Sequence, residues 1–168
     1  VKWARVQTGW AKTEKDPGVY NFAWLDEIVD KLIERGVQPW LSISYGNPLY
    51  VKSVNTAPAG AEPVNKECDK TGVGFPPIYT DEAREGWQNY VRALVKHFRD
   101  RVTHYEVWNE PDLLSFWKGQ PKAEEYVDLV RLTAEPLREE QPDAKVIGGA
   151  IAWGMTVWSL KYLEDCMK

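Results

Sequence analysis

Hydrophobic residues along the chain alternate between short β-prone runs and stretches with the 3.6-residue spacing of an amphipathic helix. The β-prone runs cover residues 3–7, 37–45, 102–108 and 145–151. Helical spacing follows each run, within residues 25–33, 87–98, 126–137 and 158–167. The pattern therefore predicts four strand–helix pairs in the order βαβαβαβα.

Residues near the expected helix ends support these boundaries. Asn21 and Thr80 are expected to cap the first two helices, because their side chains can accept free backbone N–H groups. Gly36 is expected to end the first helix. Pro121 suits the first position of the third helix, and Pro136 inside that helix is expected to kink or shorten it.

Strands that alternate with helices form parallel sheets with right-handed crossovers. Two architectures fit this order, a doubly wound sheet and a (β/α)8 barrel. The nucleotide-binding version of the doubly wound sheet carries GxGxxG after its first strand, whereas residues 7–10 here read Gln-Thr-Gly-Trp. We therefore expect an α/β fold that forms part of a (β/α)8 TIM barrel, about four βα units.

The connections differ in length at the two ends of the predicted sheet. Helix-to-strand links are short, at residues 36, 100–101 and 141–144, whereas strand-to-helix links cover residues 8–20, 46–79 and 111–120. Active sites of barrels lie on the strand-to-helix side. The 46–79 segment is longer than ordinary loops and rich in Gly, Pro and Asn, so we expect an irregular lid or cleft wall there.

Composition narrows the function classes. The 168 residues are 43% hydrophobic and 27% charged, as in an ordinary globular domain. A net charge of −4 argues against a nucleic-acid partner, and no apolar run approaches the ~20 residues that span a membrane. Nine Trp and eight Tyr are an excess that suits a sugar-binding cleft as well as a core. Compartment and oligomeric state stay open.

Metal and cofactor chemistry finds little support. Cys68 and Cys166 show no CxxC spacing, and we expect free thiols. His97 is expected on a solvated helix face, and His104 starts a strand at the end opposite the long loops. Neither histidine has a partner at metal-ligand spacing, so we predict no metal and no cofactor.

The strongest chemical signal is Tyr-Glu-Val-Trp-Asn-Glu-Pro-Asp at residues 105–112. It places Glu110 where a strand ends on the long-loop side, after Asn109 and between Trp108 and Pro111. Burial among aromatic rings disfavours the charged form of a carboxyl group and so favours the protonated form. A general acid that acts near neutral pH must carry that proton. Asn-Glu-Pro alone is a weak signal, but the preceding strand and Trp108 favour catalysis over a structural role.

Further candidates follow from their positions on strands. Glu106 faces the same side of its strand as Glu110, and a structural ion pair with Arg5 is favoured over catalysis. For Arg5 itself an active-site role is favoured. Residues that follow or end strands are candidates for a sugar cleft, with plain packing as the alternative: Trp10, Tyr45, Asn47, Trp117 and Trp153. Four other tryptophans are expected in the core: Trp3, Trp24, Trp40 and Trp87.

Trp-Asn-Glu-Pro at the end of a strand resembles the acid/base motif of the clan A (β/α)8 glycoside hydrolases. Residues 2–6, 18–26, 36–40 and 106–112, followed by Phe116 and Trp117, resemble glycoside hydrolase family 39 and its β-xylosidase-like relatives. The resemblance runs through nearly the whole chain. It implies that Asn109 binds the sugar 2-hydroxyl, Glu110 protonates the leaving oxygen, and Arg5 hydrogen-bonds the nucleophile.

In that clan the Asn-Glu pair ends the fourth strand, so the first strand here would be the second of the barrel and the last the fifth. A complete barrel needs ~250 residues, so residues 1–168 are expected to be a single fragment of a catalytic domain. The nucleophile, a Glu ending the seventh strand, would lie outside this chain. The resemblance thus implies a retaining glycosidase with a carbohydrate substrate, and a fragment that is inactive alone.

Two other readings stay open. The first is a non-catalytic carbohydrate-binding barrel, which a Glu at the end of the seventh strand in a continuing chain would exclude. The second is a metal-dependent (β/α)8 hydrolase, which ranks last because the chain contains no HxH.

Overall fold

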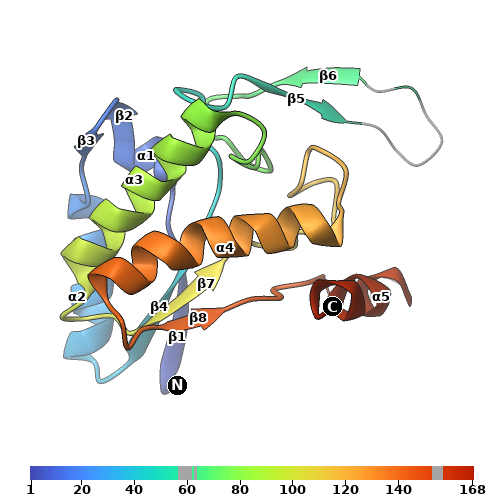
Figure 1. The fold of residues 1–168 in the computed structure, drawn as a ribbon. Coiled ribbons are helices and arrows are strands. Elements are labelled where there is room, and N and C mark those ends of the chain that lie inside the picture. Colours follow the sequence, from blue (N-terminus) through green and yellow to red (C-terminus); the bar gives the residue numbers. More distant parts are fainter. Residues whose placement is uncertain (57–61, 63, 153–156) are drawn as a thin grey trace.

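The structure is a computed structural model that describes residues 1–56, 62, 64–152 and 157–168 (Figure 1). The strands are β1 (Trp3–Gln7), β2 (Glu14–Asp16), β3 (Val19–Tyr20), β4 (Gln38–Ile43), β5 (Ser53–Thr56), β6 (Val64–Glu67), β7 (His104–Val107) and β8 (Lys145–Ile147). The helices are α1 (Trp10–Thr13), α2 (Ala23–Glu34), α3 (Asp81–Phe98), α4 (Ala123–Glu140) and α5 (Val157–Cys166).

One parallel sheet carries the fold. Its strands lie in the order β1-β4-β7-β8, and each is followed in the chain by one of the long helices α2, α3, α4 and α5. The strand order follows the chain without the reversal of a doubly wound sheet. The predicted α/β fold with four successive βα units is therefore confirmed, and the order is that of a segment of a (β/α)8 barrel.

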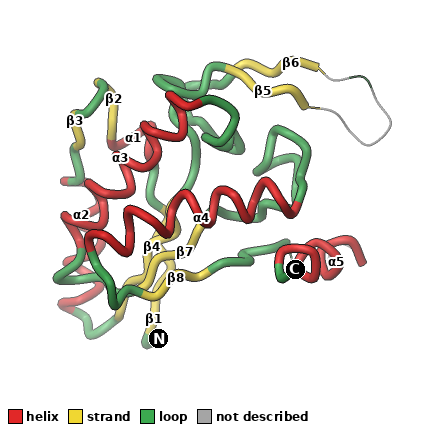
Figure 2. The backbone as a smooth tube through the Cα atoms, in the orientation of Figure 1, coloured by secondary structure: helices red, strands yellow, loops and turns green. Residues whose placement is uncertain are grey.

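The two faces of the sheet differ in chemistry. On one face Val6, Leu41 and Tyr105 lie side by side across three strands and pack with the helices into a single hydrophobic core. Figures 1 and 2 show α3 and α4 beside each other over the sheet. On the opposite face Arg5, Ser42 and Glu106 form a polar row across the same three strands. Because side chains alternate along a strand, the residues one position away face this second side.

The helix ends show how local sequence sets these elements. The Thr80 side chain accepts the Ala83 N–H at 3.2 Å, as predicted for the cap of α3. Gly36 ends α2 with φ of 71°, a left-handed conformation that glycine adopts without a Cβ clash. Asn21 accepts the Ala23 N–H at 3.1 Å, although the N-cap position itself is Phe22.

The predictions for α4 need correction. The helix begins at Ala123 with Lys122 as its N-cap, so Pro121 precedes it. It continues to Glu140 and is not shortened at Pro136. The flanking side chains Leu132 and Leu137 are buried in the core, and this packing outweighs the backbone hydrogen bond that proline cannot donate.

The long loops contain more regular structure than expected. Within residues 46–79, β5 and β6 form an antiparallel hairpin that extends away from the sheet, which corrects the prediction of an irregular segment (Figure 2). Residues 8–20 contain α1 and the β2–β3 hairpin. These strands are short and mostly polar, so they carry no hydrophobic period long enough to predict them.

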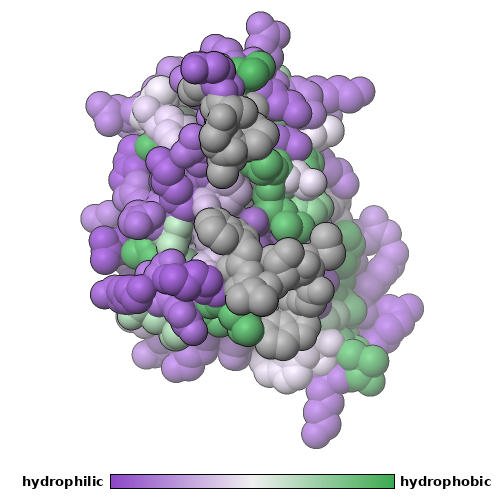
Figure 3. All heavy atoms as spheres, turned by 90° about the vertical axis from the view of Figure 1, so that its right-hand side faces the viewer, coloured by the Kyte–Doolittle hydropathy of each residue, from purple (hydrophilic) through white to green (hydrophobic). Residues whose placement is uncertain are grey.

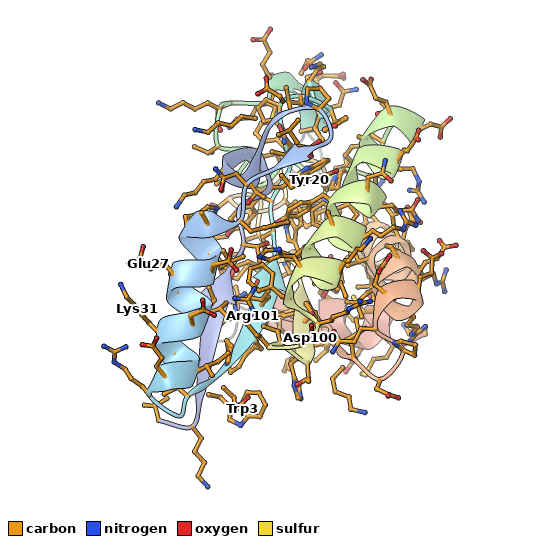
Figure 4. All side chains as sticks on the ribbon, turned by 90° about the vertical axis from the view of Figure 1, so that its left-hand side faces the viewer. Trp3, Tyr20, Glu27, Lys31, Asp100 and Arg101 are labelled. Atoms are coloured by element: carbon orange, nitrogen blue, oxygen red, sulfur yellow. The ribbon has the colours of Figure 1, made fainter. Side chains whose placement is uncertain are left out.

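The tryptophans expected in the core divide. Trp87 is fully buried as predicted, whereas Trp24 and Trp40 are partly buried. Trp3 is 42% exposed and lies at the N-terminal end of the sheet (Figure 4). Trp3 lies opposite Gln38 and Trp40 opposite Arg5 in the strand register. Both tryptophans are thus on the face of the sheet that the helices do not cover, which explains their exposure. Within the described ranges, no helix is both long and apolar enough to cross a membrane.

Candidate active site

Glu110 lies just beyond the carboxyl end of β7, on a backbone of unusual conformation. Trp108 has φ of 69° and Glu110 has φ of 47°, both in the left-handed region that few non-glycine residues adopt. Neighbouring backbone holds them there: the Trp108 N–H donates to the carbonyl of Ile43 in β4 at 2.9 Å, and the Glu110 N–H donates to the carbonyl of Ala150, in the loop after β8, at 2.7 Å. Such strain concentrates at functional sites, so the conformation supports the sequence prediction.

The aromatic residue before the Asn-Glu pair is a rigid support. Trp108 is fully buried, and its indole N–H donates to the Phe116 carbonyl at 2.7 Å. Its ring meets Trp117 edge-on, with ring centroids 5.5 Å apart. The Tyr126 hydroxyl of α4 donates to the Val107 carbonyl at 3.0 Å. The end of β7 is therefore fixed from two sides, by its own loop and by α4.

Asp112 anchors the loop that follows β8. Its side chain is buried and accepts the Ala152 N–H at 3.0 Å and the Ser159 hydroxyl at 2.6 Å. The final residue of the Trp-Asn-Glu-Pro-Asp sequence thus ties α5 to the segment that carries Glu110. Sequence reasoning did not single out Asp112, since a buried aspartate and an exposed loop aspartate look alike in sequence.

Tyr45 gathers several predicted site residues around its hydroxyl. Gln7 donates to that oxygen at 3.4 Å, and Arg5, Asn109 and Glu110 all lie close enough to influence its ionisation. Burial raises the pKa of Tyr45, Gln7 and Arg5 oppose the rise, and the Glu110 charge adds to it. The structure therefore brings Arg5, Tyr45, Asn109 and Glu110 together. Gln7 was missed, because its place at a strand end was its only signal.

Arg5 and Glu106 form the predicted ion pair across the polar face of the sheet. The Arg5 Nε donates to Glu106 Oε2 at 2.5 Å, and its Nη2 donates to the Ser42 hydroxyl at 3.0 Å. Glu106 is only 8% exposed, so the guanidinium neutralises a buried charge. Three strands thus contribute to one polar row beneath Glu110.

Three of the residues predicted to line a sugar cleft are buried. Trp10 has no exposed surface, and its indole N–H donates to Glu14 Oε2 at 2.5 Å. Asn47 donates its side-chain amide to the Glu14 carbonyl at 2.8 Å, and Trp117 is enclosed beside Trp108. A sugar ring has no access to these side chains, so they pack loops instead of lining a cleft. Trp153 lies outside the described residues.

His97 is exposed on α3, as expected, and in addition stacks on Phe22 and lies within hydrogen-bond distance of Asp26 at 2.8 Å. Arg101 donates to the same Asp26 oxygen at 2.7 Å, and Figure 4 shows it between α2 and α3. Cys68 and Cys166 are free. Among the described residues, no three His, Cys, Asp or Glu side chains are grouped as a metal site would require.

Comparison with known proteins identifies the family of the chain. The family model described as Glycosyl hydrolases family 39 matches residues 7–168 of the chain. A beta-xylosidase of Geobacillus stearothermophilus is 29% identical over 154 residues, which cover 88% of this chain and 28% of that protein. A beta-xylosidase of Caldicellulosiruptor saccharolyticus is 26% identical over 163 residues, covering 91% and 30%. The chain thus spans less than a third of these relatives.

A solved structure extends the comparison to the fold. The family 39 beta-xylosidase from Caulobacter crescentus superposes with a TM-score of 0.65 over 99% of this chain and 37% of that one, at 20% sequence identity. At that identity the likeness concerns the fold alone. It agrees with the partial (β/α)8 barrel that the strand order indicates.

Proposed function

Since the chain belongs to the glycosyl hydrolases family 39, we propose that it carries the acid/base half of a retaining glycosidase that cleaves β-xylosidic bonds. The observation that carries the proposal is the position of Glu110 just beyond the carboxyl end of β7, with its N–H bonded to Ala150 and with Tyr45 packed edge-on against Trp108. The names of the two curated relatives support a xyloside over other sugars.

In this mechanism Glu110 protonates the glycosidic oxygen as the bond to the leaving group breaks, and later takes a proton from the attacking water. Asn109, the preceding residue on the constrained backbone, would hydrogen-bond the sugar 2-hydroxyl. Glu110 is half-buried, which leaves its carboxyl partly open to a bound sugar, and the buried Trp108 two residues earlier is held by its hydrogen bond to Phe116.

Retention of configuration needs a second carboxylate ~5–5.5 Å from the first. Glu106 is only 8% exposed, so a sugar has little access to its carboxylate. We place the nucleophile in a part of the protein outside these 168 residues, and propose that the chain is inactive alone. Arg5 and Ser42 then form the polar floor against which that carboxylate would lie.

The test uses the full natural gene product and the variant Glu110→Gln. We expect kcat on xylobiose to fall about 10²–10⁴-fold, the usual contribution of a general acid. An aryl xyloside with a good leaving group should lose far less, since its departure needs little protonation. The matched control is Glu124→Gln, which removes an exposed carboxylate from the first turn of α4 and should leave both rates within about twofold.

Either of two results would contradict the proposal. Full xylobiose hydrolysis by Glu110→Gln would remove Glu110 from the acid role. Tight sugar binding by the wild type without turnover of any glycoside would favour the alternative of a non-catalytic carbohydrate-binding barrel.

A further inference from the structure

A second concave site lies away from Glu110, between the β5–β6 hairpin and the start of α4. It has a volume of about 390 Å³, within the range of sites that hold small ligands. Figure 2 shows the hairpin extending above the loop that leads into α4. We call this site the hairpin groove, and its lining residues are Ser53, Val54, Asn55, Asn65, Tyr79, Gln120, Lys122 and Glu125.

Tyr79 is the aromatic platform of the hairpin groove. Its side chain is 45% exposed overall, yet its hydroxyl donates to Glu125 Oε2 at 2.7 Å. Burial and the Glu125 carboxylate both raise the pKa of Tyr79 above its ordinary value. The polar end of the side chain is therefore held inside while part of the ring stays open to the groove.

A glycine makes room for this placement. A Cβ added at Gly119 would fall 2.1 Å from the Tyr79 hydroxyl oxygen, so any larger residue there would displace the ring. Trp117 also donates its indole N–H to the Glu125 oxygen that receives the Tyr79 hydroxyl, at 3.2 Å. The ring is thus fixed before any ligand arrives, which lowers the entropy cost of binding.

The lining around the ring is polar but nearly uncharged. It offers the Asn55, Asn65 and Gln120 amides and the Ser53 hydroxyl. Its single cation, Lys122, lies 3.9 Å from the carboxylate of Glu125, so the two charges offset each other. An exposed aromatic ring beside several amides matches a neutral polyhydroxyl ligand, whose C–H face stacks on the ring while its hydroxyls exchange hydrogen bonds.

The hairpin groove is built from the loops that follow β4 and β7. Tyr79 and the hairpin belong to the loop after β4, which contains Tyr45, and Gln120 belongs to the loop after β7, which contains Glu110. Figure 3 shows this side of the molecule, where hydrophobic side chains are seen to the right of the centre and hydrophilic ones along the left and upper edges. The same two loops thus contribute residues to the candidate active site and to the hairpin groove.

Another cavity of similar size offers a useful contrast. It lies between the β2–β3 hairpin and the start of α2, has a volume of about 440 Å³, and includes Trp24. The Lys12 ammonium lies over the Trp24 ring, 3.7 Å from its centroid. That ring face is already occupied by a cation, whereas no such cation–ring pair is formed by Tyr79 within the described residues.

From these observations we propose that the hairpin groove is a distal sugar subsite that binds a unit of a neutral β-linked oligosaccharide remote from the bond being cleaved. Tyr79 is its stacking platform, and Asn55 and Gln120 supply hydrogen bonds. The proposal deepens the glycosidase function proposed above and rests on it, because a distal subsite matters for catalysis only where the long substrate is also cleaved.

The test compares substrates of different length on the full natural gene product. The preference for xylotetraose over an aryl β-xyloside, taken as the ratio of kcat/KM values, should fall about tenfold in Tyr79→Ala, mainly through KM. Asn55→Ala combined with Gln120→Ala should lower the same ratio with the ring in place. Both asparagine and glutamine are exposed, so this second variant tests the groove without disturbing the core.

The matched control is Trp3→Ala, which removes an aromatic ring of similar exposure, 42%, from the opposite end of the sheet. It should leave the length preference unchanged. An unchanged preference in both Tyr79→Ala and the double variant, in an enzyme that cleaves xylotetraose, would overturn the subsite.

A calorimetric titration separates this outcome from failure of the proposed function. Xylotetraose is titrated into Glu110→Gln and into the same variant carrying Tyr79→Ala. Weaker binding in the second protein supports the subsite even if no turnover of any xyloside is detected. Equal affinity overturns the subsite whether or not the wild type is an enzyme.

Discussion

At the scale of single residues, the backbone around Glu110 is distinguished by two left-handed conformations, at Trp108 and at Glu110 itself. Such conformations cost roughly 1–3 kcal/mol each and persist only where neighbours impose them. Here the neighbours are backbone carbonyls, that of Ile43 in β4 on one side and that of Ala150 in the loop after β8 on the other. The position of Glu110 is therefore set by main-chain hydrogen bonds, which substitution of nearby side chains alters little.

Arg5 gives the sharpest residue-scale prediction for stability. Arg5→Ala would leave the buried Glu106 carboxylate with no cation, whereas its own side chain is 30% exposed, so screening reduces the loss. We expect a decrease of about 1–2 kcal/mol in the free energy of unfolding, measured by urea denaturation. Arg35→Ala, at the exposed end of α2, is the control and should change it by less than about 0.5 kcal/mol.

A double-mutant cycle checks the cause. If Arg5→Ala costs as much in a Glu106→Gln background as in the wild type, the loss does not come from the ion pair.

The site prediction used the rule that catalytic groups of barrels follow strand ends. Tyr45, Asn109 and Glu110 follow the ends of β4 and β7, whereas Arg5 lies in the middle of β1. Trp10 and Asn47 satisfy it equally but turn inward, where a second group in the loop holds them: the buried Glu14. Position along a strand cannot show which way the following loop folds, so their burial could not be predicted.

At the scale of elements, the end of each helix is set by one or two residues. Thr80→Ala would free the Ala83 N–H at the start of α3 and should lower the free energy of unfolding by about 1 kcal/mol. Thr80→Ser keeps a hydroxyl acceptor and should recover most of that loss. A thermal unfolding series on the three proteins checks it, and equal destabilisation by Ser and Ala would exclude the cap as the cause.

Helices α3 and α4 are joined by a salt bridge whose strength depends on pH. Arg84 donates two hydrogen bonds to Asp128, at 2.5 and 3.0 Å, and they hold the pKa of that carboxyl below its ordinary value against the opposing effect of burial. Because the folded pKa is the lower one, the contribution is complete above the unfolded pKa and is lost as pH falls through the folded value.

Asp128→Asn should therefore lower the free energy of unfolding by about 0.5 kcal/mol at neutral pH, since the Asp128 side chain is 43% exposed and screened. The difference from the wild type should shrink as pH falls below ~4. Urea denaturation at several pH values measures it. Asp143→Asn, in the exposed turn before β8, is the control, and a difference that persists at the lowest pH would contradict the ion-pair explanation.

Long periodic elements were predictable and short polar ones were not. The four long helices and the sheet strands carry apolar side chains into one core, so their period is visible in the sequence. The β5–β6 hairpin has four residues in each strand, and all of β6 is exposed. Its pairing is held mainly by backbone hydrogen bonds, which leave no trace in hydrophobic pattern.

At the scale of the whole molecule, the sheet is covered unequally. Helices pack on the face that carries Val6, Leu41 and Tyr105, while the polar row of Arg5, Ser42 and Glu106 lies on the other. In a closed barrel this second face is the interior. The polar row would therefore line the interior of a complete barrel, where side chains of the remaining strands would meet it.

The outer strands of the sheet lead to a prediction about association. β1 and β8 each pair with one strand only in the described structure, and unpaired strand edges promote association. We expect the 168-residue chain, expressed alone, to form larger species as its concentration rises, measured by light scattering after gel filtration. A chain extended by the strands that complete the barrel should not. A chain that stays monomeric at all concentrations would show that these edges are protected.

The hydrogen bonds around Glu110 also impose an order in time. Its N–H is held by Ala150, and Asp112 two residues later is held by Ala152, a partner 40 positions further along the chain. A ribosome makes the Trp-Asn-Glu-Pro sequence well before it makes these partners. During synthesis the backbone around Glu110 therefore lacks these hydrogen bonds until residues 150–152 have been translated. The local conformation of Glu110 is complete only after the loop that follows β8 has been made.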